Sequence, residues 1–220
     1  MIFLFEKSFF KKINIIPPIL TLITNLAVSF LTRPFLSDNR IMDIATAFDK
    51  KIPFLPGFIY IYVLAFLQWA VCILSVMLID REKSDYYCIG ISVGNIIAGI
   101  IFVAFPTIMA IRPEYSGGGF TGTLVRFIFA ADNPPLNLFP SIHCLFSWGV
   151  MRMLFSVKRV PVPVKIFNAV FSCLVFLSVL FVKQHVIYDI PAGILAFEAG
   201  LFIAGIIFSV KNKRKGKELV

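Results

Sequence analysis

The chain contains two histidines, His143 and His185, and both lie beside residues that could take part in chemistry. Asp189 follows His185 by four positions, so its carboxylate can reach the His185 ring if residues 185–189 are helical. An imidazole has an unperturbed pKa of about 6.5, so its neutral form can attack or exchange protons near pH 7. A neighbouring aspartate can fix the tautomer of the ring and stabilise the positive charge that develops on it. The two residues therefore indicate catalysis, or else a structural pair across one helical turn.

Long apolar segments must position these residues. Hydrophobic residues make up 59% of the 220 residues and charged residues 15%, with a mean hydropathy of +0.89, whereas about a quarter of a soluble domain is charged. Six apolar segments approach the roughly 20 residues that a helix needs to cross a bilayer: 13–33, 54–79, 88–111, 142–157, 163–183 and 187–210. The sequence thus predicts an all-α, polytopic membrane protein, a bundle of six transmembrane helices in a single membrane domain over residues 1–220.

The distribution of Lys and Arg predicts the orientation of this bundle. With six spans both termini lie on one side, and that side carries fourteen Lys and Arg residues against seven on the other. Because cytoplasmic loops are enriched in these residues, both termini are expected in the cytoplasm, in a multi-pass protein of the plasma membrane. The net charge of +9 then reflects orientation and a basic cytoplasmic tail at 211–220 near anionic lipids, and no nucleic-acid partner is expected.

This topology brings distant polar residues to the extracytoplasmic end of the bundle. His185 lies between the fifth and sixth spans, His143 lies with Ser141 at the start of the fourth, and Arg112 follows the third. Each has a structural interpretation: Arg112 can anchor a helix end at the head groups, Ser141 can begin a helix, and His143 can be a satisfied interfacial residue. His185 can form a structural pair with Asp189. Their convergence at one membrane face instead favours a functional site, because ionisable residues there are costly unless paired.

Three motifs carry a resemblance to a known family: RP at 112–113, PSIH at 140–143 and HVIYD at 185–189. In order and spacing they resemble the motifs of the type 2 phosphatidic acid phosphatase superfamily. The phrases NLFPSIH and DKKIPFLPGFIYIY are most similar to the branch that contains inositol-phosphorylceramide synthases and related bacterial phosphatases. The resemblance implies a family-like catalytic core at about 49–205, within a six-span bundle whose site lies at one membrane face.

The resemblance also assigns roles to the converging residues. It implies that His185 attacks a phosphate ester and forms a phosphohistidine, while Asp189 accepts the other ring N–H. His143 would protonate the leaving alkoxide and later deprotonate the attacking water. Arg112 would hold phosphate oxygens bidentately, and Ser141, with the amides that begin the fourth span, would add hydrogen-bond donors.

Two positions depart from the family pattern and leave the phosphate contacts open. The family often has a lysine where this chain has Phe105 and an arginine where it has Val179, so two phosphate-binding cations are missing. Lys183 and Arg126 are the candidates to replace them. The SGGG stretch at 116–119 either lets the backbone approach a ligand or forms a flexible turn.

No metal and no cofactor is expected. A binuclear metal site needs several histidines or carboxylates, and the chain has two histidines and four cysteines without ligand spacing. Asp38, Asp43 and Asp49, in the first outer loop, also lack a ligand pattern. Apolar residues around them predict a short amphipathic helix on the membrane surface instead: Ile41, Ile44, Ala45 and Phe48.

With the resemblance, these inferences favour a membrane lipid phosphatase that hydrolyses a lipid phosphomonoester or diphosphate at the extracytoplasmic face without a metal. A lipid phosphotransferase, in which another lipid or alcohol takes the place of water, uses the same covalent step. A six-span transporter or binding protein with a degenerate site is the non-enzymatic alternative. The expected partners are a lipid phosphate substrate and the membrane lipids. Phosphatidic acid, phosphatidylglycerophosphate and polyprenyl diphosphate are all compatible substrates.

Overall fold

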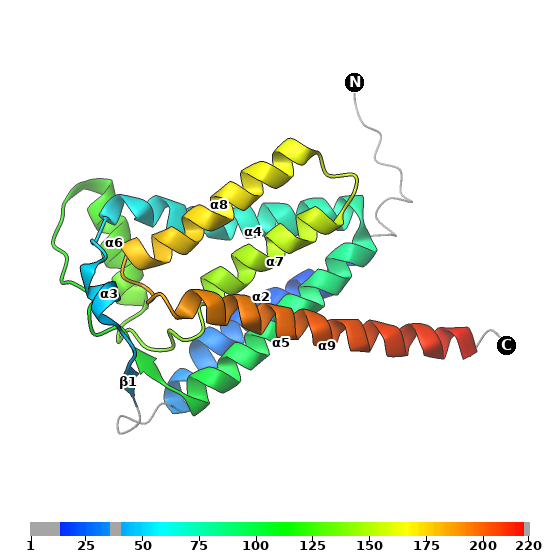
Figure 1. Cartoon of the computed structure of the whole chain (residues 1–220), viewed down its shortest axis with the longest axis horizontal. Helices are drawn as coiled ribbons and strands as arrows, with labels where there is room; N and C mark the ends of the chain where they lie inside the picture. Colours follow the sequence, from blue (N-terminus) through cyan, green and yellow to red (C-terminus); the bar gives the residue numbers. More distant parts are fainter. Residues whose placement is uncertain (1–13, 36–40, 218–220) are drawn as a thin grey trace.

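Helices make up most of the computed structural model, which describes residues 14–35 and 41–217 (Figure 1). Each of the six apolar segments overlaps one helix of 15 residues or more. These are α2 (Ile16–Leu31), α4 (Ile59–Ile79), α5 (Arg81–Ala104), α7 (Ile142–Ser156), α8 (Val162–Phe181) and α9 (Asp189–Lys217). The predicted helical class is therefore confirmed, while Asp38 and the last residues of the predicted tail, 218–220, lie outside the described residues.

Among the described residues, four helical segments have the length and apolar composition to cross a membrane: Pro56–Ile79, Arg81–Ala104, Val162–Phe181 and Asp189–Lys211. The other two helices of the bundle are shorter, because α2 has 16 residues and α7 has 15. At 1.5 Å per residue each spans about 22–24 Å, less than the roughly 30 Å of the hydrocarbon core. A membrane association is thus supported by four helices, and the predicted count of six spans is not supported by helix length alone.

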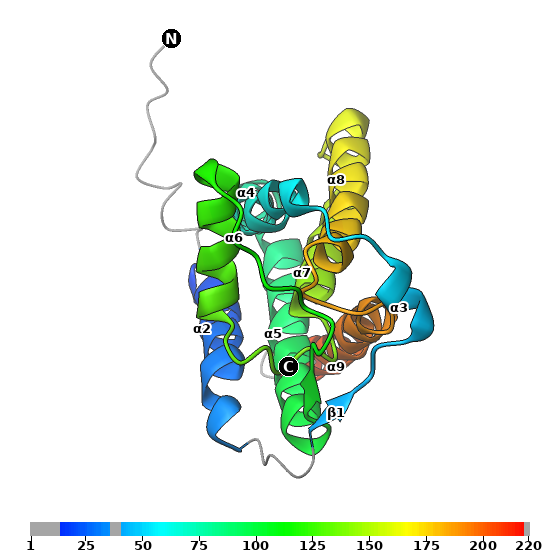
Figure 2. The ribbon, with the colours of Figure 1, turned by 90° about the vertical axis from the view of Figure 1, so that its left-hand side faces the viewer.

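Helix α7 lies inside the bundle and packs against α4, α5, α8 and α9 (Figures 1 and 2). Most of its side chains are buried, among them Leu145 and Met153, and they contact the apolar faces of these neighbours. Helices α5 and α9 approach closely because glycines face one another: a Cβ on Gly200 would lie 2.3 Å from the Gly90 carbonyl oxygen. The buried α7 fixes the position of His143, which lies in its first turn.

The connections between helices sort into two ends of the bundle. At one end Arg159 donates a hydrogen bond to the Ile79 carbonyl oxygen, so the α7–α8 loop contacts the α4–α5 turn. The longer connections gather at the opposite end, onto which Figure 2 looks: residues 41–58, 105–141 and 182–188. This second end is the one at which the sequence predicts a site.

Several elements at this end were not predicted from the sequence. Helix α6 (Gly119–Ala131) follows the SGGG stretch, and Gly119 begins it with a φ of 68°, in the left-handed region that glycine adopts without strain. The strands β1 (Met42–Asp43) and β2 (Thr107–Ile108) pair in parallel. Two short 3-10 helices, η1 (Arg33–Phe35) and η3 (Pro56–Phe58), follow α2 and precede α4.

The predicted amphipathic helix over residues 41–48 is wrong. Strand β1 occupies part of this segment, and α3 (Ala47–Lys51) is a helix of only five residues. Thr46 begins α3 with a capping box, in which its hydroxyl accepts the Asp49 N–H while the Asp49 carboxylate accepts the Thr46 N–H. Ile44 and Ala45 instead pack against a buried cluster formed by Met109, Leu138 and Val186. These apolar residues therefore cover the protein's own interior.

Candidate active site

His185 lies in a turn between α8 and α9, just before α9 begins at Asp189. Its Nδ1 atom lies 3.0 Å from Asp189 Oδ2, and the same carboxylate oxygen accepts the Val186 N–H at 3.0 Å. The pair is thus made by a turn, whereas the sequence suggested a helical turn over 185–189. A helix that began at His185 would place Pro191 beyond its first turn, where the proline ring clashes with the preceding carbonyls.

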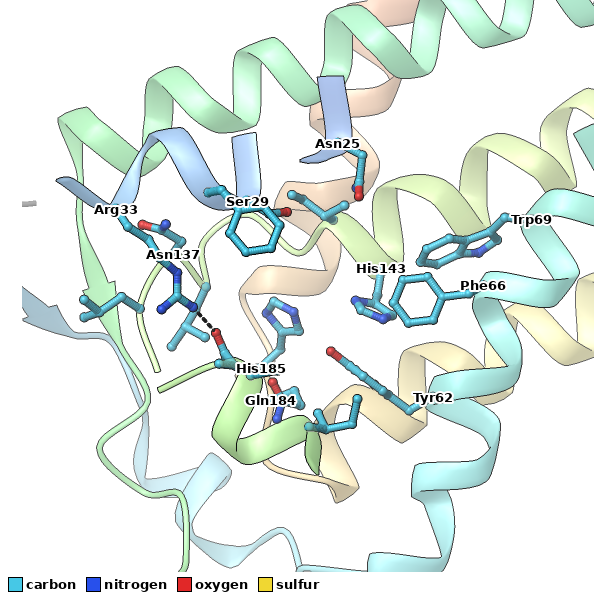
Figure 3. Close-up of a pocket in the computed structure, with 17 residues that line it drawn as sticks. Asn25, Ser29, Arg33, Tyr62, Phe66, Trp69, Asn137, His143, Gln184 and His185 are labelled. Carbon is cyan, nitrogen blue, oxygen red and sulfur yellow. Dashed lines mark hydrogen bonds and ion pairs between the residues drawn. The ribbon is translucent and has the colours of Figure 1, made fainter. Parts of the chain in front are cut away.

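The two histidine rings face the same cavity (Figure 3). His185 is 9% exposed and Asp189 is fully buried. Because Nδ1 of His185 faces the carboxylate, its other ring nitrogen, Nε2, is the atom available for reaction. The His143 ring centroid lies 6.4 Å from that of His185. A small group placed between the rings would therefore contact both.

Aromatic side chains of α4 hold the His143 ring. Tyr62 stacks on it with centroids 4.1 Å apart, and Phe66 and Trp69 contact it edge to face, each at 5.2 Å. The His143 Nε2 atom is buried and has no hydrogen-bond partner among the described residues. Buried polar atoms are usually paired, and an unpaired one at a cavity marks a place for a ligand.

Ser141 ties the start of α7 to the start of α9. Its hydroxyl caps α7 by accepting the Cys144 N–H at 3.3 Å, and its own N–H donates to the Asp189 carbonyl oxygen at 3.1 Å. The contact is close, since a Cβ on Gly193 would lie 2.3 Å from the Ser141 carbonyl oxygen. Ser141 is fully buried and does not line the cavity. In this structure it positions the two histidines relative to each other.

Arg112 reaches the same end of the bundle but is occupied by protein partners. Its Nη2 donates to Asp132 Oδ2 at 2.7 Å and to Gln184 Oε1 at 3.1 Å, and its Nε donates to the Lys183 carbonyl oxygen at 3.3 Å. The guanidinium also lies over the Phe129 ring, 4.9 Å from its centroid. The side chain is 8% exposed and is absent from the cavity wall. Arg112 thus links the turn before His185 to the end of α6.

Neither candidate replacement for the missing cations lines the cavity. The Lys183 ammonium donates to the carbonyl oxygens of Asp49 and Ile52, at 2.9 and 2.7 Å. Burial lowers the pKa of Lys183, and the negative charge of Asp49 partly offsets this by raising it. Arg126 is exposed on α6, where it donates to the Gly117 carbonyl oxygen and to Thr123. The structure therefore leaves both side chains away from the two histidines.

Asp49 holds the turn that carries His185. It is 1% exposed, and its Oδ1 accepts the Ile187 N–H at 2.8 Å while its Oδ2 accepts the Thr46 N–H at 2.8 Å. Together with the contact of Lys183 to the Asp49 carbonyl oxygen, these bonds fix residues 183–187 against α3. This role of Asp49 could not be predicted from the sequence, because it depends on a contact across 138 residues.

A cavity of about 220 Å³ is lined by the two histidines. Its wall also includes polar residues that sequence reasoning missed, among them Arg33, Tyr62, Asp132 and Gln184. Arg33 Nη2 donates to Asp132 Oδ1 at 2.8 Å, the contact drawn as a dashed line in Figure 3. Gln184 directly precedes His185, the first residue of the third motif, and this position was the available sequence signal. No motif marks Arg33.

An apolar groove of about 390 Å³ adjoins this cavity along α2 and α4. The two share Asn25, Phe66 and Trp69, so the groove leads from the histidines along the helices. The remaining wall is almost entirely aliphatic or aromatic, for example Ile19, Leu22 and Ile73. A molecule with a small polar end and a long apolar chain fits this combination of surfaces.

No cluster of three or more His, Cys, Asp or Glu side chains that could hold a metal ion is found in residues 14–35 and 41–217. Comparison with known proteins adds no assignment: no family model matches the sequence, and no curated protein and no solved structure matches it significantly.

Proposed function

We propose that the protein is a membrane lipid phosphatase that works through a phosphohistidine on His185. The observation that carries this proposal is the pairing of His185 with the buried Asp189, opposite a second histidine that has an unpaired ring nitrogen. A nucleophile with an orienting carboxylate behind it, facing a proton-transfer group across a cavity, provides the parts that covalent phosphoryl transfer requires. The three motifs resemble those of the type 2 phosphatidic acid phosphatases, which agrees with this chemistry.

In the first step His185 Nε2 attacks phosphorus, an N–P bond forms, and the bond from phosphorus to the lipid oxygen breaks. His143, in its protonated form, gives its proton to that oxygen; a phosphate anion in the cavity favours this form by charge attraction. In the second step His143 takes a proton from water, the water oxygen attacks phosphorus, and the N–P bond breaks. Asp189 accepts the Nδ1–H of His185 throughout and stabilises its positive charge.

The apolar groove supports a lipid as the substrate. It adjoins the cavity of the two histidines between α2 and α4, so a phosphate beside the histidines could be joined to a chain lying along these helices. Lipid phosphates have this form, whereas a soluble phosphate ester would leave the groove empty. The chain of a membrane lipid already lies among hydrocarbon, so the groove keeps it in apolar surroundings while its phosphate lies beside the histidines.

The best test is a phosphate-release screen with the purified full-length protein in vesicles. We expect inorganic phosphate from at least one lipid monophosphate or diphosphate, in the presence of excess EDTA, because the proposed groups act without a metal ion. A matched reaction with a short-chain alcohol separates the alternatives. A transferred product without free phosphate would support the phosphotransferase, and no reaction with any lipid would support a transporter or binding protein.

The topology proposed with this function has six spans, both termini in the cytoplasm and the site at the extracytoplasmic face of the plasma membrane. The excess of Lys and Arg on the side of the termini supports it, with the four long apolar helices. A cysteine at Ser116, which is exposed beside α6, should react with an impermeant thiol reagent on intact cells. One at Lys213 should not. The exposed Cys173 is replaced by serine in both variants. Labelling of the cysteine at position 213 but not of the one at position 116 would show that the protein has the opposite orientation.

A further inference from the structure

Arg33 and Gln184 bring hydrogen-bond donors to the cavity that holds the two histidines (Figure 3). Neither belongs to a position at which the family pattern has a phosphate-binding cation. They come from separate parts of the chain, Arg33 from η1 after α2 and Gln184 from the turn before α9. The fold therefore brings these two side chains, from distant parts of the sequence, to the cavity of the histidines.

Arg33 is held by a carboxylate that resembles an anionic ligand. Its Nη2 donates to Asp132 Oδ1 at 2.8 Å and its Nη1 to the Asn133 carbonyl oxygen at 3.4 Å. The other oxygen of Asp132 accepts from Arg112 at 2.7 Å, so the carboxylate lies between two guanidinium groups. A guanidinium has five N–H donors, and the Arg33 side chain is 27% exposed. Arg33 thus has both the spare donors and the access to bind a second anionic oxygen.

Gln184 offers a donor without a partner. The side chain is 97% buried, since its exposed fraction is 3%, and its Oε1 accepts from Arg112. This bond fixes the orientation of the amide, so Nε2 must point elsewhere. The Nε2 atom is buried and unpaired among the described residues. A buried donor that is held in place without a partner at a cavity wall fits an acceptor that the ligand supplies.

We propose that Arg33 and Gln184 bind the phosphoryl oxygens of the substrate, and that Asp132 holds Arg33 in place until the phosphate takes over its Nη2. This inference rests on the proposed function for the identity of the substrate. Arg112 remains bound to Asp132 and continues to hold the turn that carries His185. Arg33, just after α2, thus supplies one of the two cations missing at Phe105 and Val179, and Gln184 adds a neutral donor. This arrangement also joins the phosphate site to the helix that forms one wall of the apolar groove.

A structural interpretation of the same contacts makes a different prediction. If the bond between Arg33 and Asp132 only ties α2 to α6, then loss of either side chain has the same consequence. If Asp132 occupies the place of a phosphate, the two losses have opposite consequences for anion binding. Arg33→Gln removes a donor from the phosphate, whereas Asp132→Asn removes a competing negative charge.

The test measures binding of inorganic phosphate to the full-length protein by its stabilisation against heat, which needs no turnover. Arg33→Gln should raise the dissociation constant of phosphate about tenfold to a hundredfold, the range for a lost charge-assisted hydrogen bond. Gln184→Met should raise it by a smaller factor, and Asp132→Asn should lower it. Arg126→Gln is the matched control, an exposed arginine at the same end of the bundle, and should leave the constant within about twofold.

An unchanged dissociation constant in Arg33→Gln, or an equal weakening in Arg33→Gln and Asp132→Asn, would overturn this inference even if the wild-type protein releases phosphate from a lipid. Arg33-dependent phosphate binding without turnover of any lipid would contradict the proposed function and leave the phosphate site standing. The melting temperature of each variant without phosphate identifies a variant that fails to fold. In that case Arg33→Lys, which keeps the charge and loses the planar fork, is used in its place.

Discussion

Replacement of His185 by glutamine should abolish phosphate release and prevent any covalent labelling of the protein. The loss expected for removal of a nucleophile is on the order of 10⁴–10⁶-fold. The amide of glutamine fills similar space but offers no basic nitrogen, so no N–P bond can form. The measurement is the amount of acid-labile phosphate bound to the protein after rapid mixing with a radioactive lipid phosphate. Wild-type protein should carry the label, and the variant should carry none.

Tyr188→Phe is the matched control for this experiment. Tyr188 lies in the same turn, three residues after His185, and its side chain is 57% exposed. Its hydroxyl can be removed without touching the bonds between His185, Asp189 and Val186. Full labelling of the control with none in His185→Gln assigns the phosphate to His185. A phosphoenzyme that persists in His185→Gln would show that another side chain is the nucleophile.

The positions of the long helices were predictable because apolar content and helical length are local properties. Their boundaries were less so, and α5 is the clearest example. The apolar pattern placed this span at 88–111, but the helix runs from Arg81 to Ala104. Asp80 caps it before a charged first turn, and Pro106 follows its end. The two ends of α5 are thus set by charged residues before it and by a proline after it. A search for apolar residues alone detects neither.

The candidate site was predictable in part for a similar reason. The sequence placed His143, His185 and Asp189 at one end of the bundle, because an even number of crossings returns the chain to the same face. It could not predict Arg33, whose contact with Asp132 spans 99 residues, or Asp49, which binds the Ile187 N–H from 138 residues away. Helix α6 was missed as well, and it places Asp132 at its C-terminal end. Such contacts depend on how the connections fold over the helix ends.

Contacts of this kind also separate the role of Arg112 in the structure from the phosphate-binding role that its motif implies. From the motif alone an arginine after a span is free to hold phosphate. In the structure its guanidinium is occupied by Asp132, Gln184 and the Lys183 carbonyl oxygen. Under the proposed function, Arg112 would affect catalysis through the position of His185. The phosphate contacts would then be made by side chains that line the cavity.

Replacement of His143 by glutamine should affect substrates according to their leaving groups. A lipid alkoxide leaves poorly unless it is protonated, and general acid catalysis is typically worth 10²–10⁴-fold. The rate of phosphoenzyme formation from a lipid monophosphate should therefore fall by about that factor. Nitrophenolate leaves readily without a proton, so phosphoenzyme formation from nitrophenyl phosphate should fall much less. Glutamine keeps a polar side chain against Tyr62 and Trp69 without the acid.

The first step must be measured by itself, because His143 would also assist the attack of water on the phosphoenzyme. Rapid-quench measurement of the labelled protein isolates that step, and its melting temperature reports whether the variant keeps its fold. The unpaired, buried Nε2 of His143, across the cavity from His185, is the structural reason to expect this selective effect. Equal losses for both substrates would contradict the assignment of His143 as the acid. His143 would then act by binding the phosphate beside Arg33 and Gln184, and the leaving oxygen would have to take its proton from water.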